Sequence, residues 1–107
     1  MQANFKRPFT QYVKKAKRPL QLAIEDAVLL VCKTPGLGEF KTGDLAGIQV
    51  YKFRFNRQEY LIAYHAPATD APLEFLFIDF YQVGSHENFY NELKKYLRQE
   101  GRKGPTI

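Results

Sequence analysis

Residues 45–66, LAGIQVYKFRFNRQEYLIAYHA, decide the fold, because apolar and charged side chains alternate along them with a period of two. One side of the strand that this period predicts carries Tyr51, Phe53 and Phe55. The other side carries Val50, Lys52 and Arg54. The letters NRQ at 56–58 indicate a turn, and EYLIAYHA at 59–66 has the composition of a second strand. The stretch therefore predicts a β-hairpin with one apolar and one basic face.

Toward the C-terminus, the Pro-rich segment 67–72 predicts a turn before a third strand at 73–83, LEFLFIDFYQV. This strand is more continuously apolar than the others, so we expect it to be central in the sheet. Residues 84–100 then change to a helical period, whose buried stripe consists of Phe89, Leu93, Tyr96 and Leu97. Residues 101–107 have no period and are expected to form a frayed tail.

Toward the N-terminus, two helices precede the hairpin, with a short strand or extended arm before them. The first helix is expected to begin near Pro8, and the second runs from Pro19 to about Lys33. Because the link between them is short, we expect the two to run antiparallel. The chain of 107 residues is long enough for one core and too short for two ordinary domains.

The order of these elements predicts an α+β fold over residues 1–100. Its two N-terminal helices pack on a twisted antiparallel sheet of three to four strands, and a C-terminal helix follows. We expect no internal repeat and no second domain.

The chain is basic, with 16 Lys and Arg against 11 Asp and Glu, a formal net charge of +5 and a pI of about 9.4. The positive charge is concentrated, because Glu25 is the first carboxylate in the sequence. Such a distribution favours a polyanionic partner. The candidate RNA-binding residues are Lys14, Lys15, Lys17, Arg18 and, in the hairpin turn, Arg57.

Several classes of site are disfavoured by composition. Cys32 is the only cysteine, so neither an intramolecular disulfide nor a thiolate metal cluster is expected, and its apolar surroundings indicate a buried, inert thiol. The two histidines lack metal-ligand spacing, so we expect no metal and no cofactor. No apolar run approaches the length of a membrane span, which indicates a cytoplasmic protein.

The basic strand is the first candidate site. Alternation directs Lys52 and Arg54 to one side of the sheet, and Arg57 in the adjoining turn adds a third cation, a set suited to phosphate. The alternative is a solvated edge strand that carries charge against aggregation. These residues alone do not separate the two readings.

His86 is the second candidate. Ser85 is a plausible N-cap and Glu87 suits a first helical turn, so His86 could simply face water at the start of a capped helix. Alternatively, His86 and Tyr90 share a helix face and provide a proton donor and a stacking surface beside the cations. Asp79, inside the apolar strand, needs a partner: a His, an Arg or a backbone N–H.

Residues 45–66 and 73–97 resemble the RelE/ParE superfamily of bacterial type II toxins. Tyr51, Lys52 and Arg54 match a Tyr-Lys-x-Lys/Arg strand that follows a Leu-x-Gly lead. Tyr60 and Tyr64 match a Tyr-x-x-x-Tyr strand, and GSHENFY at 84–90 is similar to the Gly-Thr-His-Ser-Asp-Leu-Phe segment of the YafQ type. The chain departs from RelE at Leu61, where RelE has an arginine, and near Gly84, where a second family arginine has no clear equivalent.

The resemblance implies a ribosome-dependent mRNA endoribonuclease that uses in-line attack by a 2′-hydroxyl. It implies that His86 is the general acid, that Tyr90 holds a nucleobase, and that Lys52 and Arg54 stabilise phosphate. Glu59 lies near the acidic position of the YafQ type and is a candidate base. The implied partners are mRNA, the ribosome and a cognate acidic antitoxin; the alternative is a ParE-like inhibitor of DNA gyrase without nuclease chemistry.

Overall fold

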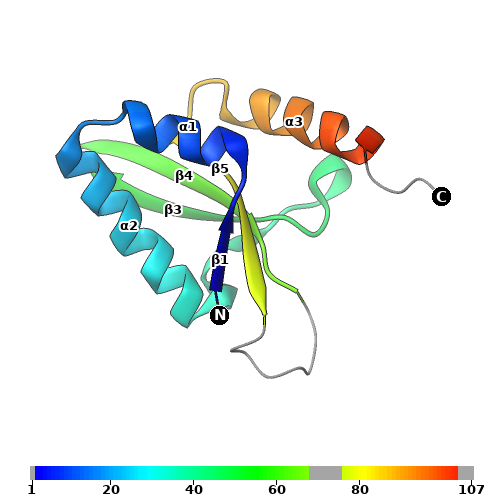
Figure 1. Ribbon diagram of the computed structural model, residues 1–107, viewed down its shortest axis with the longest axis horizontal. Helices are drawn as coiled ribbons and strands as arrows, with labels where there is room; N and C mark the ends of the chain where they lie inside the picture. Colours follow the sequence, from blue (N-terminus) through cyan, green and yellow to red (C-terminus); the bar gives the residue numbers. More distant parts are fainter. Residues whose placement is uncertain (1, 68–75, 104–107) are drawn as a thin grey trace.

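Five strands form one mixed sheet in the order β1-β5-β4-β3-β2 (Figure 1). The computed structural model describes residues 2–67 and 76–103. Within these residues the strands are β1 (Gln2–Phe5), β2 (Glu39–Phe40), β3 (Gln49–Phe55), β4 (Gln58–His65) and β5 (Phe77–Ser85). The predicted α+β class is confirmed.

The sheet differs from the prediction in strand number and direction. It has five strands rather than three or four, and β1 pairs with β5 in parallel, whereas the other pairs are antiparallel. The two additional strands have only four and two residues. β1 falls where a short strand or extended arm was expected, whereas the two residues of β2 contain too few alternations to reveal a strand from sequence. The hairpin was predicted correctly, and its turn places Asn56 and Arg57 at φ of 54° and 67°, as a two-residue type I′ turn requires.

Three helices in the described part of the chain cover the sheet: α1 (Arg7–Lys15), α2 (Arg18–Lys33) and α3 (Phe89–Lys103). Short 3₁₀ turns at Pro35–Leu37 and Gly43–Leu45 lead from α2 to β3. Pro8 and Pro19 lie in the first turns of α1 and α2, as predicted. After the short link, α2 folds back on α1 and splays away from it (Figure 1).

The C-terminal end of the chain departs from the prediction. Helix α3 extends to Lys103, so the predicted tail starting at residue 101 begins too early. Residues 104–107 lie outside the described residues, as does most of the predicted Pro-rich turn.

Hydrophobic cores lie on both faces of the sheet. On one face, α1 and α2 pack over strand residues that include Ile62, Tyr64, Ile78 and Phe80. On the other face, α3 packs through Phe89 and Leu93 over Val50, Leu61 and Ala63. Burial on both faces explains why Leu61, Ile62, Ala63 and Tyr64 are all inaccessible to solvent. The central strand is therefore β4, and β5, predicted to be central, lies between β1 and β4.

A β-bulge between β4 and β5 shifts the register of the two strands. The side chains at the end of β5 therefore point to the other face of the sheet than unbroken alternation would give. Ala63 pairs with Gln82 and Tyr64 with Phe80, so Tyr81 is the extra residue. After the bulge, Gln82 donates a hydrogen bond of 2.8 Å from Nε2 to the carbonyl of Phe89. The bulge thereby ties the strand end that precedes His86 to the first residue of α3.

The Tyr64 hydroxyl joins β4 to the loop after α2. It donates to the Pro35 carbonyl at 2.6 Å and accepts from the Gly38 backbone N–H at 2.8 Å, and Gln49 Nε2 lies 3.2 Å away. Burial raises the pKa of Tyr64, so the hydroxyl stays protonated and keeps its donor role.

We expect Tyr64→Phe to lower the free energy of unfolding by about 1–3 kcal/mol, because it removes the acceptor of the buried Gly38 N–H and one of the two donors to the Pro35 carbonyl. Urea denaturation at neutral pH measures the change. Tyr51→Phe is the matched control on the same sheet face, where the ring is only partly buried. Equal stabilities of the two variants would contradict this reading of the hydrogen bonds.

Candidate functional site

His86 lies in a three-residue connection between β5 and α3 and not inside the helix. Ser85 is still in the sheet, paired with Tyr60, and α3 begins at Phe89. The prediction that Ser85 caps the helix is therefore wrong, because the ladder with β4 continues through this residue. Asn88, at φ of 60°, makes the turn into the helix, and its carbonyl accepts the Glu92 N–H at 3.0 Å.

The His86 side chain contacts the Glu59 carboxylate. Nε2 of His86 lies 3.0 Å from Oε1 of Glu59, and 56% of the His86 side chain is exposed, against 35% for Glu59. Glu59 stands near the start of β4, one residue before Tyr60, the sheet partner of Ser85. Pairing between β4 and β5 thus brings the candidate acid and the candidate base from 27 positions apart into direct contact.

Tyr90 lies beside His86, as predicted. The two ring centroids are 6.4 Å apart at 59°, and the Phe89 ring packs edge-on to Tyr90 at 5.3 Å. Phe89 is buried and Tyr90 is half-buried. The Tyr90 ring is thus held by the core on one side and remains partly open to solvent, as a stacking surface must be.

Lys52 and Arg54 are exposed on the face of the sheet that α3 covers. They share that face with Val50, which packs into the core beneath α3. Arg54 is the register partner of Glu59, so it stands directly across from the carboxylate that holds His86. Its Nη2 lies 3.4 Å from the Arg57 carbonyl, which keeps the guanidinium near the hairpin turn.

The alternative interpretation of this basic strand also has structural support. β2 pairs only with Gln49 and Val50, so β3 beyond Val50 forms a sheet edge among the described residues. Charged side chains on such an edge oppose aggregation. Through Glu59, the register partner of Arg54, this strand also lies near His86 and Tyr90.

Lys41 and Glu39 also belong to this site and were not predicted. Nζ of Lys41 lies 2.7 Å from Oε1 of Glu39 and 5.5 Å from the centroid of the Tyr90 ring. The hydrogen bond with Glu39 raises the pKa of Lys41, and Lys41, with a smaller effect of Lys52, lowers the pKa of Glu39. A two-residue strand gives too little periodic signal to show from sequence that Lys41 lies here.

The predicted RNA-binding residues of the N-terminal helices are all exposed, and they flank the link between α1 and α2. Tyr12 of α1 lies close to Gly84 and Tyr60, so the C-terminal end of α1 reaches the strand ends that carry Glu59 and His86. In Figure 1 the α1–α2 link and the β3–β4 turn lie on the same side of the molecule. Arg57 lies in the β3–β4 turn, and the basic residues of the α1–α2 side are Lys14, Lys15, Lys17 and Arg18.

The remaining candidates have structural partners. Asp79 accepts a 2.8 Å hydrogen bond from the Asn4 amide, rather than from the His, Arg or backbone N–H that was predicted, because β1 pairs with β5. Cys32 is only partly buried, and desolvation raises the pKa of its thiol. Lys6 pairs with Glu100 at 3.6 Å, which links the start of α1 to α3.

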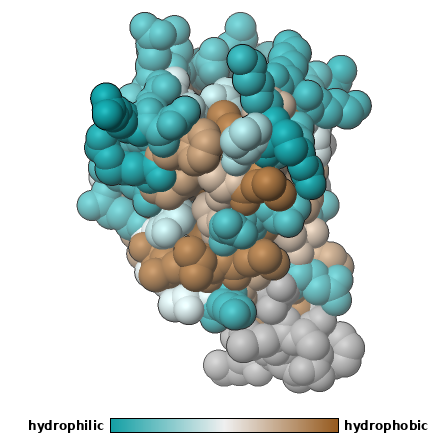
Figure 2. Space-filling view, turned by 90° about the vertical axis from the view of Figure 1, so that its left-hand side faces the viewer, coloured by the Kyte–Doolittle hydropathy of each residue, from teal (hydrophilic) through white to brown (hydrophobic). Residues whose placement is uncertain are grey.

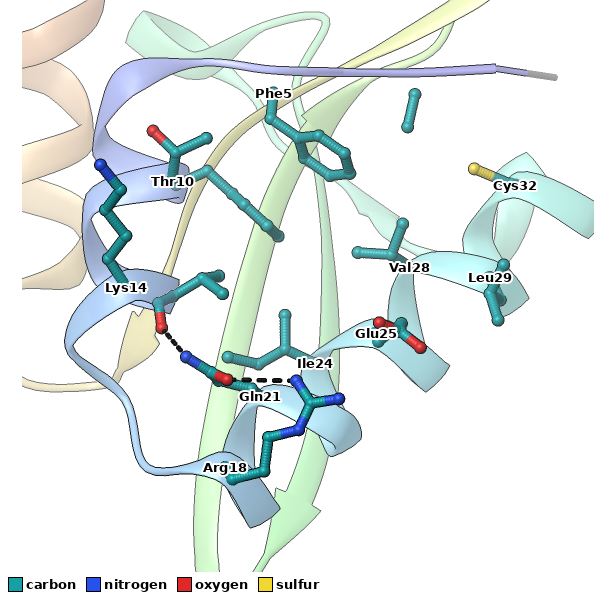
Figure 3. A pocket seen from close by; sticks show the side chains of 13 residues that line it. Phe5, Thr10, Lys14, Arg18, Gln21, Ile24, Glu25, Val28, Leu29 and Cys32 are labelled. Atoms are coloured by element: carbon teal, nitrogen blue, oxygen red, sulfur yellow. Dashed lines mark hydrogen bonds between the residues drawn. The ribbon is translucent and has the colours of Figure 1, made fainter.

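An apolar groove lies between β1, α1 and α2. Its volume is about 690 Å³, and its lining includes Phe5, Phe9, Val13, Ile24, Val28 and Leu29. Figure 3 shows Lys14 and Arg18 at one end of the groove and Cys32 at the other. Figure 2, which views the molecule from the side of α2, shows apolar side chains gathered below a rim of hydrophilic ones.

No helix among the described residues is long and apolar enough to cross a membrane. In the same residues, no three His, Cys, Asp or Glu side chains gather as a metal site would need.

The sequence was compared with curated proteins and with models of protein families. Curated proteins give no match. A family model described as "ParE-like toxin of type II bacterial toxin-antitoxin system" matches residues 4–94, which is more than half of the chain and includes every residue of the site around His86. The chain therefore belongs to the ParE-like toxin family of type II toxin–antitoxin systems, within the RelE/ParE superfamily.

Proposed function

We propose that this toxin cleaves mRNA on the ribosome, with His86 as general acid. The observation that carries the proposal is the contact between His86 and Glu59 at 3.0 Å, next to the Tyr90 ring and across from Arg54. A titratable imidazole, a stacking surface and cations on one sheet face are the groups that RNA cleavage needs. Primer extension on transcripts isolated after induction tests it, with new 5′ ends inside coding sequences as the expected result.

The proposed reaction needs a proton donor on one side of the phosphorus. The 2′-hydroxyl attacks phosphorus, the bond from phosphorus to the 5′-oxygen breaks, and a 2′,3′-cyclic phosphate remains. Protonated His86 donates to the departing 5′-oxygen from Nδ1, while its Nε2–H stays with Glu59. Lys52 and Arg54 stabilise the negative charge that develops on the phosphorane oxygens.

Glu59 fits the role of a positioning residue better than the role of base. In an in-line attack, the acid and the base act on opposite sides of the phosphorus, whereas Glu59 is in direct contact with the acid. A carboxylate bound to Nε2 orients the ring and leaves Nδ1 for the substrate. The 2′-hydroxyl proton then passes to water.

The basic residues around the α1–α2 link provide affinity for ribosomal RNA. Lys14, Lys15, Lys17 and Arg18 are exposed, and contacts of lysine with phosphate are independent of sequence and sensitive to salt. Such contacts suit a cytoplasmic enzyme whose substrate is aligned by the ribosome. No metal and no cofactor are needed for the reaction proposed.

The second candidate function is inhibition of DNA gyrase. The description of the matching family as ParE-like favours it, and a binding protein would not need the His86–Glu59 contact. The two functions leave different products in the cell. Cleaved transcripts with intact DNA support the nuclease, whereas intact transcripts with DNA breaks at gyrase sites support the inhibitor.

We also propose a binding site for the antitoxin that membership of this family implies. The groove between β1, α1 and α2 offers an apolar floor, and Lys14 and Arg18 stand at its edge. An amphipathic helix with acidic flanks complements both features. The groove lies on the α1–α2 face of the sheet, so the antitoxin would need a further segment to reach Lys52 and Arg54 on the face that α3 covers.

Leu29→Asp is expected to weaken binding of the antitoxin by at least about tenfold, because Leu29 lines the groove and is 56% exposed. Leu30→Asp is the matched control: Leu30 is 49% exposed on the same helix and is not among the groove residues. Isothermal titration with the purified antitoxin measures both affinities. Equal losses in the two variants would place the antitoxin elsewhere.

A further inference from the structure

We propose that Lys41 binds a phosphate of the nucleotide whose base stacks on Tyr90. This inference rests on the proposed nuclease function and adds to it a residue that neither the basic strand nor the family resemblance indicated. With Lys41 in this role, the loop after β2 forms one side of the RNA site and the connection that carries His86 forms the other.

The backbone holds Lys41 in place at this position. Its N–H donates to the Ile48 carbonyl at 2.9 Å, immediately beyond the β2–β3 ladder in which Glu39 pairs with Val50. The side chain is only 22% exposed and ends 5.5 Å from the centre of the Tyr90 ring. Lys41 and His86 therefore both lie next to the same tyrosine, one from the β2 side and one from the connection before α3.

Glu39 keeps this cation paired when no ligand is bound. Its carboxylate lies 2.7 Å from Nζ of Lys41 and is 69% exposed. An ion pair this open to water contributes little to stability, so a phosphate with more charge and more acceptors can replace the carboxylate. Lys52 also acts on Glu39, so the exchange would put the phosphate near two lysines.

The arrangement suits a nucleotide better than an isolated anion. A lysine ammonium beside an aromatic ring can bind a phosphate while the ring stacks on the attached base. Lys41 also compensates for a missing charge, because Leu61 stands where the resemblance places an arginine and is buried beneath α3. The replacement cation comes from the opposite side of β3, on a loop that the RelE-like pattern does not include.

The test is binding of a short oligoribonucleotide whose 2′-hydroxyls are methylated, so that it cannot be cleaved. Fluorescence anisotropy gives Kd between 50 mM and 1 M NaCl for the wild type, Lys41→Met and Lys33→Met. Lys33 is the matched control, an exposed lysine at the end of α2 on the opposite face of the sheet. Loss of one phosphate contact should lower the slope of log Kd against log salt by about 0.7. The affinity that Lys41→Met loses relative to the wild type should therefore be about eightfold larger at 50 mM NaCl than at 1 M.

Two further variants separate charge from packing. Lys41→Arg keeps the charge and should keep the wild-type salt slope, and Glu39→Gln should tighten binding because the competing carboxylate is gone. The role of Lys41 would be wrong if Lys41→Met kept the wild-type salt slope of log Kd, or if Lys41→Met and Lys41→Arg lost the same affinity. The nuclease proposal would stand in either case. If neither Lys52→Met nor Arg54→Met changed the Kd for the oligoribonucleotide, both proposals would be wrong.

Discussion

His86→Ala should abolish growth arrest and slow cleavage of ribosome-bound mRNA by about 10²–10⁴-fold, the usual contribution of a positioned general acid. Without the imidazole, the 5′-oxygen leaves as an alkoxide while Lys52 and Arg54 still hold the phosphate. The fold should survive, because the His86 side chain is 56% exposed and its polar contact is with Glu59 alone among those described. Single-turnover cleavage on stalled ribosomes measures the loss, and circular dichroism checks the fold.

Neighbouring variants make this result specific. Glu87→Ala is the matched control, since Glu87 is the next residue, is exposed, and should leave the rate unchanged. Glu59→Gln keeps a hydrogen-bonding side chain but loses the charge, so it should slow cleavage less than His86→Ala and change its pH profile. If His86→Ala still caused full growth arrest while transcripts stayed intact, the nuclease proposal would be wrong and gyrase would remain as the target.

Most of the fold could be predicted from sequence because its major elements carry strong periodic signals. The alternation from Val50 to Phe55 gave the strand, and the two residues of the turn that follows adopt the conformation expected of a tight hairpin. What could not be predicted depends on long-range pairing. β1 is a strand only because β5 offers its edge, and β2 only because β3 does. A short strand or extended arm was expected at the position of β1, but not its parallel pairing with β5, and β2 is too short to be recognised from sequence.

The candidate site was partly predicted, and in one respect for the wrong reason. His86 and Tyr90 were expected together on a helix face, yet they meet because a three-residue connection turns His86 back toward the first turn of α3. The contact of Glu59 with His86 follows from the β4–β5 register, which sequence does not supply. Lys41 escaped prediction because its position depends on the loop beyond a two-residue strand.

Restoring the family arginine with Leu61→Arg should unfold the protein instead of making it a better nuclease. Leu61 has no exposed surface, packs with Val50, Phe89 and Leu93 under α3, and has Lys52 as its cross-strand neighbour. A buried guanidinium without a carboxylate partner, next to another cation, should cost about 4–5 kcal/mol or more, most of the stability of a typical small domain.

Urea denaturation and the soluble yield measure the effect of Leu61→Arg, with Leu61→Met as the control that keeps volume and polarity and should cost less than about 1.5 kcal/mol. If the arginine variant folds with near wild-type stability and cleaves mRNA faster, then α3 must lift from the sheet at little cost, and the buried face beneath it would be part of the RNA site. If it unfolds as expected, the cations of the proposed RNA site around His86 come from β3 and the loop after β2, because the packing of α3 leaves no room for a cation on β4 at this position.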